Sequence, residues 1–253
     1  MPATVLSLLI AAFAILAGAG SAAAAEIKVL TAGAMRGVVD ALLPAFEKAT
    51  GHKVTLDNAT AGVLAKRIGD DEAFDLAIIT PSVIDALVAK GKISAPRVDL
   101  AKVGIGVAVK DGAPVPDIAT VEAFKAALLA AKSVAYIDPK AGGSSGIYFD
   151  GLIDRLGIGE IVRAKARLKA GGYVAELVAS GEAELAVHQI SEIRPVKGVR
   201  LVGPLPAEIQ NTTVYAAGLG AAAKDPVAAK ALLDHLAGAP AAAVLSAKGM
   251  EKP

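Results

Sequence analysis

The chain has 253 residues, a formal net charge of +1, no cysteine, no tryptophan and a hydrophobic share of 54%. This composition is too apolar for a disordered chain, and the length suffices for one sizeable core or two modest lobes. A nearly neutral chain with 4% aromatic residues lacks the basic face and stacking platforms that nucleic acid binding requires. Without cysteine, neither disulfides nor thiolate metal sites can form.

The N-terminal segment has the pattern of an export signal. An apolar run from Val5 to Leu16 is followed by small residues and by Ala23-Ala24-Ala25. Such a run before an A-x-A site is typical of a cleaved secretory signal, although no Lys or Arg precedes this one. The run is also shorter than the ~20 apolar residues of a membrane span. We therefore expect a signal peptide at 1–25, cleaved near Ala25, and a soluble periplasmic protein. We expect no lipid anchor, because the site has no cysteine.

Short apolar runs alternate with helical patterns between residues 26 and 91. The apolar runs cover 26–31, 53–58 and 74–80, and helical patterns follow at 35–50, 63–71 and 83–91. Gly51 and Gly91 stand where a helix C-terminus favours glycine, and Pro81 suits the first turn of a helix. This alternation predicts βαβ units and a parallel sheet.

This alternation of apolar runs and helical patterns is interrupted at residues 99–112, a long β-prone run that no helical pattern directly follows. Helical patterns then cover 121–131, 146–156, 174–180, 226–237 and 240–248, and extended runs cover 133–138, 184–190, 198–206 and 212–219. The sequence therefore predicts an α/β protein of two lobes, the second inserted in the first. We place lobe 1 at 26–105 plus 206–253 and lobe 2 at 106–205, with crossings near 102–109 and 204–214.

Ligands of such sheets bind at the carboxyl ends of the strands, where helix N-termini point free N–H groups outward. Five loops rich in small and hydroxyl residues occupy these positions, at 31–37, 58–62, 80–82, 140–146 and 188–191. Their composition lets the backbone approach a ligand closely, so they form the candidate site.

The loop Gly142-Gly143-Ser144-Ser145-Gly146 admits three interpretations. It lacks the Lys of a phosphate-binding P-loop. It matches G-x-S-x-G, with His188 and His235 downstream. However, six residues, 138–143, separate Ser144 from the preceding strand, whereas a nucleophile elbow turns sharply. We favour an anion-binding helix N-terminus; the simpler alternative is that Ser144 only caps the helix.

With these loops identified, the chain resembles the periplasmic molybdate-binding proteins of ABC importers. The resemblance spans essentially the whole mature chain and is clearest in VLTAGAMRGVVDALLPAFEKATGHKV, VLAKRIGDDEAFDLAI and DPKAGGSSGIY. It implies a type II periplasmic-binding-protein fold, with two βα lobes, a hinge and a ligand cleft between the lobes.

The resemblance also implies ligand positions, and several of them differ here. Two family serines that hold a tetrahedral oxyanion fall at Ala34 and Ala61. Backbone donors of the family fall at Ser145 and near Gly171, and its ligand-contacting tyrosine falls at His188. The loss of two hydroxyls and the gain of a titratable ring disfavour molybdate.

A wider donor set can replace the missing hydroxyls. We expect it to comprise Arg36, Asn58, Thr60, Ser144, Ser145, Tyr148, His188 and Gln189. An arginine fork pairs bidentately with a carboxylate, although Arg36 can equally be a solvated helix charge and Tyr148 can pack between the lobes. His52 and His235 are expected at the surface. No metal-binding pattern is present, because the three histidines are scattered.

The sequence therefore favours an exported, monomeric solute-binding protein of an ABC importer, with an ABC permease as partner and no cofactor. Its ligand would be a small anion, with an organic carboxylate favoured over molybdate or tungstate. The main alternative is an enzyme, because exported aconitate isomerases resemble this family. Moving a double bond beside carboxylates requires a base and donors for the developing charge. In that case His188 would be the catalytic base.

Overall fold

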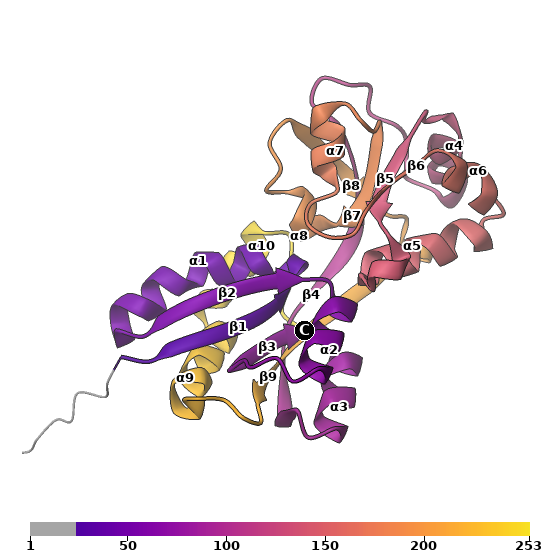
Figure 1. Cartoon of the computed structure of the whole chain (residues 1–253). Coiled ribbons are helices and arrows are strands. Elements are labelled where there is room, and N and C mark those ends of the chain that lie inside the picture. The colour runs from indigo at the N-terminus through magenta and orange to yellow at the C-terminus, as the bar shows by residue number, and fades with distance from the viewer. Residues whose placement is uncertain (1–23) are drawn as a thin grey trace, which may run out of the picture.

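The computed structural model describes residues 24–253, which form two lobes side by side (Figure 1). The predicted signal peptide lies outside the described residues, apart from Ala24 and Ala25. The first lobe begins with three βα pairs: β1 (Glu26–Ala32) with α1 (Gly33–Thr50), β2 (Lys53–Ala59) with α2 (Ala61–Gly69), and β3 (Leu76–Ile79) with α3 (Pro81–Ala89). β1 pairs in parallel with both β2 and β3, as the alternation predicts. The carboxyl ends of β1 and β2 are in register, because Ala32 is paired with Ala59.

One long strand, β4 (Ile93–Lys110), runs from the first lobe into the second (Figure 1). Its first part, as far as Gly104, pairs antiparallel with β9 (Thr212–Gly220). From Ile105 onward it pairs instead with β7 (Leu185–Gln189), and from Gly106 also with β8 (Val199–Pro204). The amide of Gln210 binds both the N–H and the C=O of Ile105, at 2.9 Å each. This side chain fixes the backbone where the chain changes lobe.

The second lobe repeats the βα arrangement. It contains α4 (Val121–Ala130), β5 (Val134–Ile137), the short 3-10 helix η1 (Pro139–Ala141), α5 (Ser144–Arg155), α6 (Gly159–Ala164), β6 (Ala166–Lys169), α7 (Ala175–Ser180) and α8 (Ile190–Ile193). β5 pairs in parallel with β6 and β7. A second short helix, η2 (Ala207–Ile209), precedes β9, and α9 (Pro226–Ala237) and α10 (Pro240–Ala247) pack against the first lobe (Figure 1).

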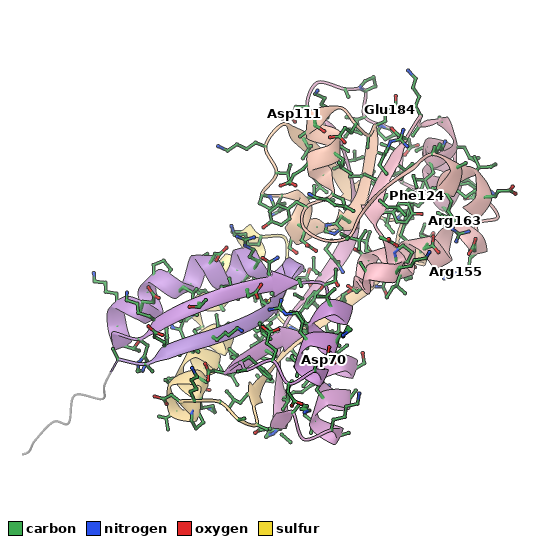
Figure 2. All side chains as sticks on the ribbon, viewed as in Figure 1. Asp70, Asp111, Phe124, Arg155, Arg163 and Glu184 are labelled. Atoms are coloured by element: carbon green, nitrogen blue, oxygen red, sulfur yellow. The ribbon has the colours of Figure 1, made fainter. Side chains whose placement is uncertain are left out.

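Each lobe has its own hydrophobic core. One cluster draws on residues 27–103 and 215–250, with Met35 and Ile78 fully buried. Two others draw only on residues 105–209. Figure 2 shows Phe124 inside the second lobe and Arg163 on its outer face, where Arg163 pairs with Asp150 and Asp154. Separate cores leave the two lobes joined mainly by β4 and the β8–β9 connection.

Several details differ from the sequence-based expectation, among them the short helices α6 and α8, which were not predicted. The helix expected from residue 146 begins at Ser144, and Gly143 is its N-cap, so Ser144 does not cap the helix. The strand β6 was not predicted, because its four residues, Ala166-Arg167-Leu168-Lys169, carry two charges and no apolar run. Within residues 24–253, no single helix is long and apolar enough to cross a membrane. The bent pair α9–α10 meets that criterion only when its two helices are taken together.

Candidate functional site

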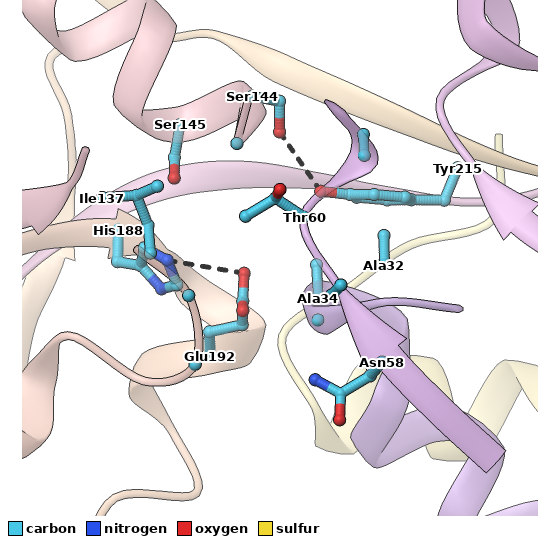
Figure 3. A pocket seen from close by; sticks show the side chains of 16 residues that line it. Ala32, Ala34, Asn58, Thr60, Ile137, Ser144, Ser145, His188, Glu192 and Tyr215 are labelled. Atoms are coloured by element: carbon cyan, nitrogen blue, oxygen red, sulfur yellow. Dashed lines mark hydrogen bonds and ion pairs between the residues drawn. The ribbon is translucent and has the colours of Figure 1, made fainter. Parts of the chain in front are cut away.

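A small cavity of about 30 Å³ lies between the lobes, at the carboxyl ends of the strands. The first lobe lines it with Ala34, Asn58, Thr60, Ala61 and Tyr215, and the second with Ser144, Ser145, Gly171, His188 and Glu192 (Figure 3). A water molecule needs roughly 10–15 Å³ measured in this way. The lobes are therefore close together, and a ligand of several carbons can enter only when they open.

Three helices begin at this cavity. Residues of the first turns of α1, α2 and α5 line it, namely Gly33 and Ala34, Ala61, and Ser144 with Ser145. The first N–H groups of a helix have no partner within the helix, and the helix dipole makes this end positive. Convergence of three such ends favours an anionic ligand.

Two titratable side chains face each other in the second lobe. His188 comes from the end of β7, and Glu192 lies in the short helix α8 that follows. His188 Nε2 is 3.6 Å from Glu192 Oε2, and the two side chains are only 2% and 9% exposed (Figure 3). His188 Nδ1 has no hydrogen-bond partner among the described residues. These groups are therefore removed from water without strong compensating contacts.

Burial disfavours the charged form of both side chains. The charged form is the protonated one for His188 and the deprotonated one for Glu192, so the two pKa values move in opposite directions. Burial lowers the pKa of His188 to about 3, and the nearby charge of Lys169 adds to this effect. It raises the pKa of Glu192 to about 8. At neutral pH the imidazole is therefore unprotonated while the carboxyl group keeps its proton. An acid and a base stand side by side.

A second set of polar side chains links the two lobes by hydrogen bonds to hydroxyl groups. Gln189 Nε2 donates to Ser144 Oγ at 3.1 Å and to Thr213 Oγ1 at 2.9 Å. Ser144 Oγ lies 3.3 Å from the hydroxyl of Tyr215, which comes from β9 (Figure 3). Burial raises the pKa of Tyr215 well above its usual value, so this hydroxyl stays neutral. Ser144 contacts no histidine, and His235 lies instead against the carbonyl of Leu42 at 3.2 Å. The geometry of a serine hydrolase is not assembled here.

The rim of the cavity is a direct contact between the lobes. Gly62 N–H donates to the carbonyl of Gly142 at 3.1 Å, and the Thr60 hydroxyl donates to the carbonyl of Ala141. Thr60 also accepts from Val63 N–H as the cap of α2. Its hydroxyl therefore closes the rim in this state instead of pointing freely at a ligand.

The structure brings most of the predicted site residues together at the cavity. Three predicted residues do not line it. Arg36 stands at the mouth, half exposed, with its guanidinium on Asn58 Oδ1 at 3.1 Å and on Asp40 at 3.5 Å. Tyr148 donates to the carbonyl of Ile209 at 2.8 Å, beneath the guanidinium of Arg155. Gln189 lies behind the wall and orients Ser144.

Sequence reasoning missed Glu192 and Tyr215. Glu192 comes one residue after the loop 188–191, so only its spacing of four residues from His188 pointed to it. Tyr215 belongs to the predicted extended run 212–219 and lies one residue beyond the predicted crossing at 204–214. Its role depends on how β9 turns toward the second lobe.

Comparison with known proteins identifies relatives of the chain. A family model described as bacterial extracellular solute-binding protein matches residues 27–251. A protein named aconitate isomerase, from a Pseudomonas species, is 36% identical over 232 residues, which are 89% of this chain and 87% of that protein.

Solved structures of binding proteins have a similar fold. The periplasmic molybdate-binding protein of Azotobacter vinelandii superposes with a TM-score of 0.76 at 20% identity, over 90% of this chain and 99% of that one. The sulfate-binding protein SubI of Mycobacterium tuberculosis H37Rv gives 0.72 at 16% identity, over 90% and 87%. The predicted two-lobed fold and the predicted resemblance are confirmed.

Proposed function

The chain belongs to the family of bacterial extracellular solute-binding proteins, and we propose that it uses this fold as an isomerase of aconitate. The observation that carries the proposal is the buried pair of His188 and Glu192, an uncharged base beside a protonated acid at the cavity wall. The relative named aconitate isomerase, 36% identical, supports the choice of substrate.

The reaction moves one double bond along a symmetric carbon skeleton. Aconitate has a CH₂ group and a vinyl CH on either side of a central carbon, and each of the three carbons carries a carboxylate. Removal of a proton from the CH₂ and addition of a proton to the vinyl carbon shift the double bond to the other side. The product is again aconitate, in either the cis or the trans form. No electrons are gained or lost overall, so a base and an acid suffice.

One side chain removes the proton in this reaction and the other supplies a proton. His188, unprotonated, takes the CH₂ proton at Nε2, and the carboxyl group of Glu192 gives its proton to the vinyl carbon. The resulting imidazolium then returns a proton to the Glu192 carboxylate across the short distance between them. A bound carboxylate raises the pKa of His188, because an opposite charge favours the imidazolium. Substrate binding thus strengthens the base.

The carboxylates of the substrate are held by neutral donors and helix ends. The N-termini of α1, α2 and α5 face the cavity with Ser145 and Asn58 beside them. Arg36 stands at the mouth and contacts Asn58. We propose that it draws the anion in and binds the outermost carboxylate.

Proton NMR of the mature chain with trans-aconitate tests this function. We expect signals of cis-aconitate to grow in with the wild-type protein. His188→Gln and Glu192→Gln should each lower the rate by roughly 10²–10⁴-fold, the usual contribution of a general base or acid, and both should still bind the substrate. A wild-type protein that binds trans-aconitate without interconverting it would overturn the proposal.

The second candidate is a solute-binding protein of an ABC importer, and it is favoured by the family model and by the oxyanion-binding neighbours. Its ligand would be a carboxylate or an oxyanion such as molybdate, and an ABC permease would be its partner. Thermal-shift titrations with molybdate, sulfate and trans-aconitate separate the two functions. Stabilisation by an anion that the protein leaves chemically unchanged supports transport.

The description of the family as extracellular supports export of the chain under either function. We infer that residues 1–25 are a signal peptide and that the mature chain is a periplasmic monomer. N-terminal sequencing of the exported protein should give Glu26 or a near neighbour as the first residue. Light scattering should give the mass of a single chain.

A further inference from the structure

Ser144 and Tyr215 have two hydroxyl protons between them, but only one hydrogen bond joins the two hydroxyls. The amide of Gln189 donates one hydrogen bond to Ser144 Oγ and one to Thr213 Oγ1. Ser144 Oγ therefore accepts one hydrogen bond before its own proton is counted. Ser144 and Tyr215 carry one hydroxyl proton each, and a single hydrogen bond of 3.3 Å joins them. One of the two protons is left for a group outside the pair.

The hydrogen bond between the two hydroxyls can run in either direction. Accepting from Gln189 makes the Ser144 hydroxyl a better donor, and when it donates to the oxygen of Tyr215 the free proton is the one on Tyr215. Both hydroxyl residues line the cavity, and Tyr215 is only 3% exposed. Within the wall, the acceptor without a partner is Gln189 Oε1, and a ligand in the cavity would supply another acceptor for this proton.

The proposed reaction needs such a donor. When the CH₂ proton of aconitate leaves, negative charge moves onto the oxygens of a neighbouring carboxylate. An unprotonated histidine with a low pKa is a weak base, so the developing charge must be stabilised elsewhere. A neutral donor held in place within a dry site does this without binding the ground state as strongly as a cation would.

We propose that Tyr215 is a further catalytic residue, which donates a hydrogen bond to the substrate carboxylate that becomes negatively charged, and that Gln189 and Ser144 orient it. This inference rests on the proposed isomerase function. Tyr215 comes from β9 and Ser144 from the second lobe. The donor is therefore assembled only when the lobes close, which the contact between Gly62 and Gly142 marks in this structure.

Tyr215→Phe tests this inference, because it keeps the ring and removes only the hydroxyl. We expect kcat for trans-aconitate to fall by about 10²–10³-fold, as for loss of one oxyanion-hole donor. The dissociation constant, measured by calorimetry, should change less than about threefold, since ground-state binding is spared. Ser144→Ala should cost less than Tyr215→Phe, because the Tyr215 hydroxyl remains.

Tyr136→Phe is the matched control. Tyr136 is also buried, but its hydroxyl faces Asp150 at 3.4 Å within the second lobe, and we expect its kcat to match the wild type. A kcat of Tyr215→Phe within threefold of the wild type overturns the inference and leaves the isomerase function standing. An equal loss in both variants, together with lowered melting temperatures, also overturns it. A wild-type protein without turnover overturns the proposed function itself, so the two failures are distinct.

Discussion

Gly33 and Glu192 belong to different lobes, yet a Cβ atom on Gly33 would overlap Oε1 of Glu192. Gly33 is the first residue of α1, so the absence of a side chain lets the carboxyl group of one lobe sit against the first turn of a helix in the other. The position of the proposed acid therefore depends on a glycine across the cleft.

Gly33→Ala should move this carboxyl group and lower activity. The methyl group meets only the end of a flexible side chain, so we expect the melting temperature to stay within a few degrees of the wild type. Misplacement of a reacting group by ~1 Å can cost about 10²-fold in rate, and we expect a loss of roughly 10–100-fold in kcat. Gly37→Ala is the control, because its Cβ would meet only Lys248 at an ordinary distance of 3.8 Å. Equal activity in the two variants would contradict the role of Gly33.

The pH dependence of kcat/KM should show Glu192 as an acid. Its pKa is raised to about 8, whereas that of His188 is lowered to about 3. The active form, with His188 unprotonated and Glu192 protonated, dominates between these values. We expect kcat/KM to stay level from about pH 5 to 7 and to fall tenfold per pH unit above about pH 8, because kcat/KM reports the free enzyme. A rate that rises through pH 8 would instead identify the Glu192 carboxylate as the base.

The sequence predicted the lobes and most of the cavity wall because both depend on strand ends. Thr60 directly follows β2, His188 lies near the end of β7, and Ser144 begins the helix that comes after β5 and η1. The carboxyl ends of strands gather at one place in this fold. Glu192 and Tyr215 depend on tertiary structure, namely the turn into a four-residue helix and the approach of β9 to the other lobe. Tyr148 is a counter-example: it follows the Gly-Ser loop closely, but its ring lies under Arg155, about two helical turns along the same helix.

Glu192→Gln should stabilise the protein at alkaline pH. The pKa of Glu192 is raised from its ordinary 4.5 to about 8 in the folded chain, so folding favours the protonated form. The wild type therefore loses stability as pH rises from about 4.5 to 8, while the variant has no such titration. We expect the melting temperature of the variant to exceed that of the wild type by about 10 °C or more at pH 9, given about 1.4 kcal/mol per pH unit between the two pKa values and about 2–4 °C per kcal/mol for a chain of this size. The difference should nearly vanish at pH 5. An equal difference at both pH values would mean that the carboxyl group is not buried uncharged.

Arg36→Ala should weaken substrate capture without slowing the chemical step. The guanidinium is half exposed and contacts Asn58 and Asp40 at the mouth of the cavity, so it does not reach the reacting carbons. We expect KM for trans-aconitate to rise about 3–10-fold with kcat unchanged, since such a change removes binding common to the substrate and the transition state. The effect should shrink at 0.5 M salt, because exposed charges are screened. A lower kcat at unchanged KM would place Arg36 in the chemistry instead.

Gly62→Ala should hinder closure of the lobes. Its Cβ would lie 2.8 Å from the Cα of Gly142, which is backbone on the opposite lobe and cannot rotate away. Gly142 has a φ of 73°, a conformation that favours glycine, so neither residue at this contact tolerates a side chain easily. Because Tyr215, Glu192 and the helix ends surround the substrate only in the closed state, we expect kcat to fall by at least about tenfold, as for loss of a closing step that completes a catalytic site.

Small-angle X-ray scattering with saturating trans-aconitate measures this closure directly. The wild type should contract when the ligand binds, and Gly62→Ala should keep a larger radius of gyration. Gly69→Ala, at the other end of the same helix, meets nothing within 4 Å and should contract like the wild type. If Gly62→Ala contracts fully and still loses activity, the contact between Gly62 and Gly142 does not limit closure, and the glycine acts on the substrate itself.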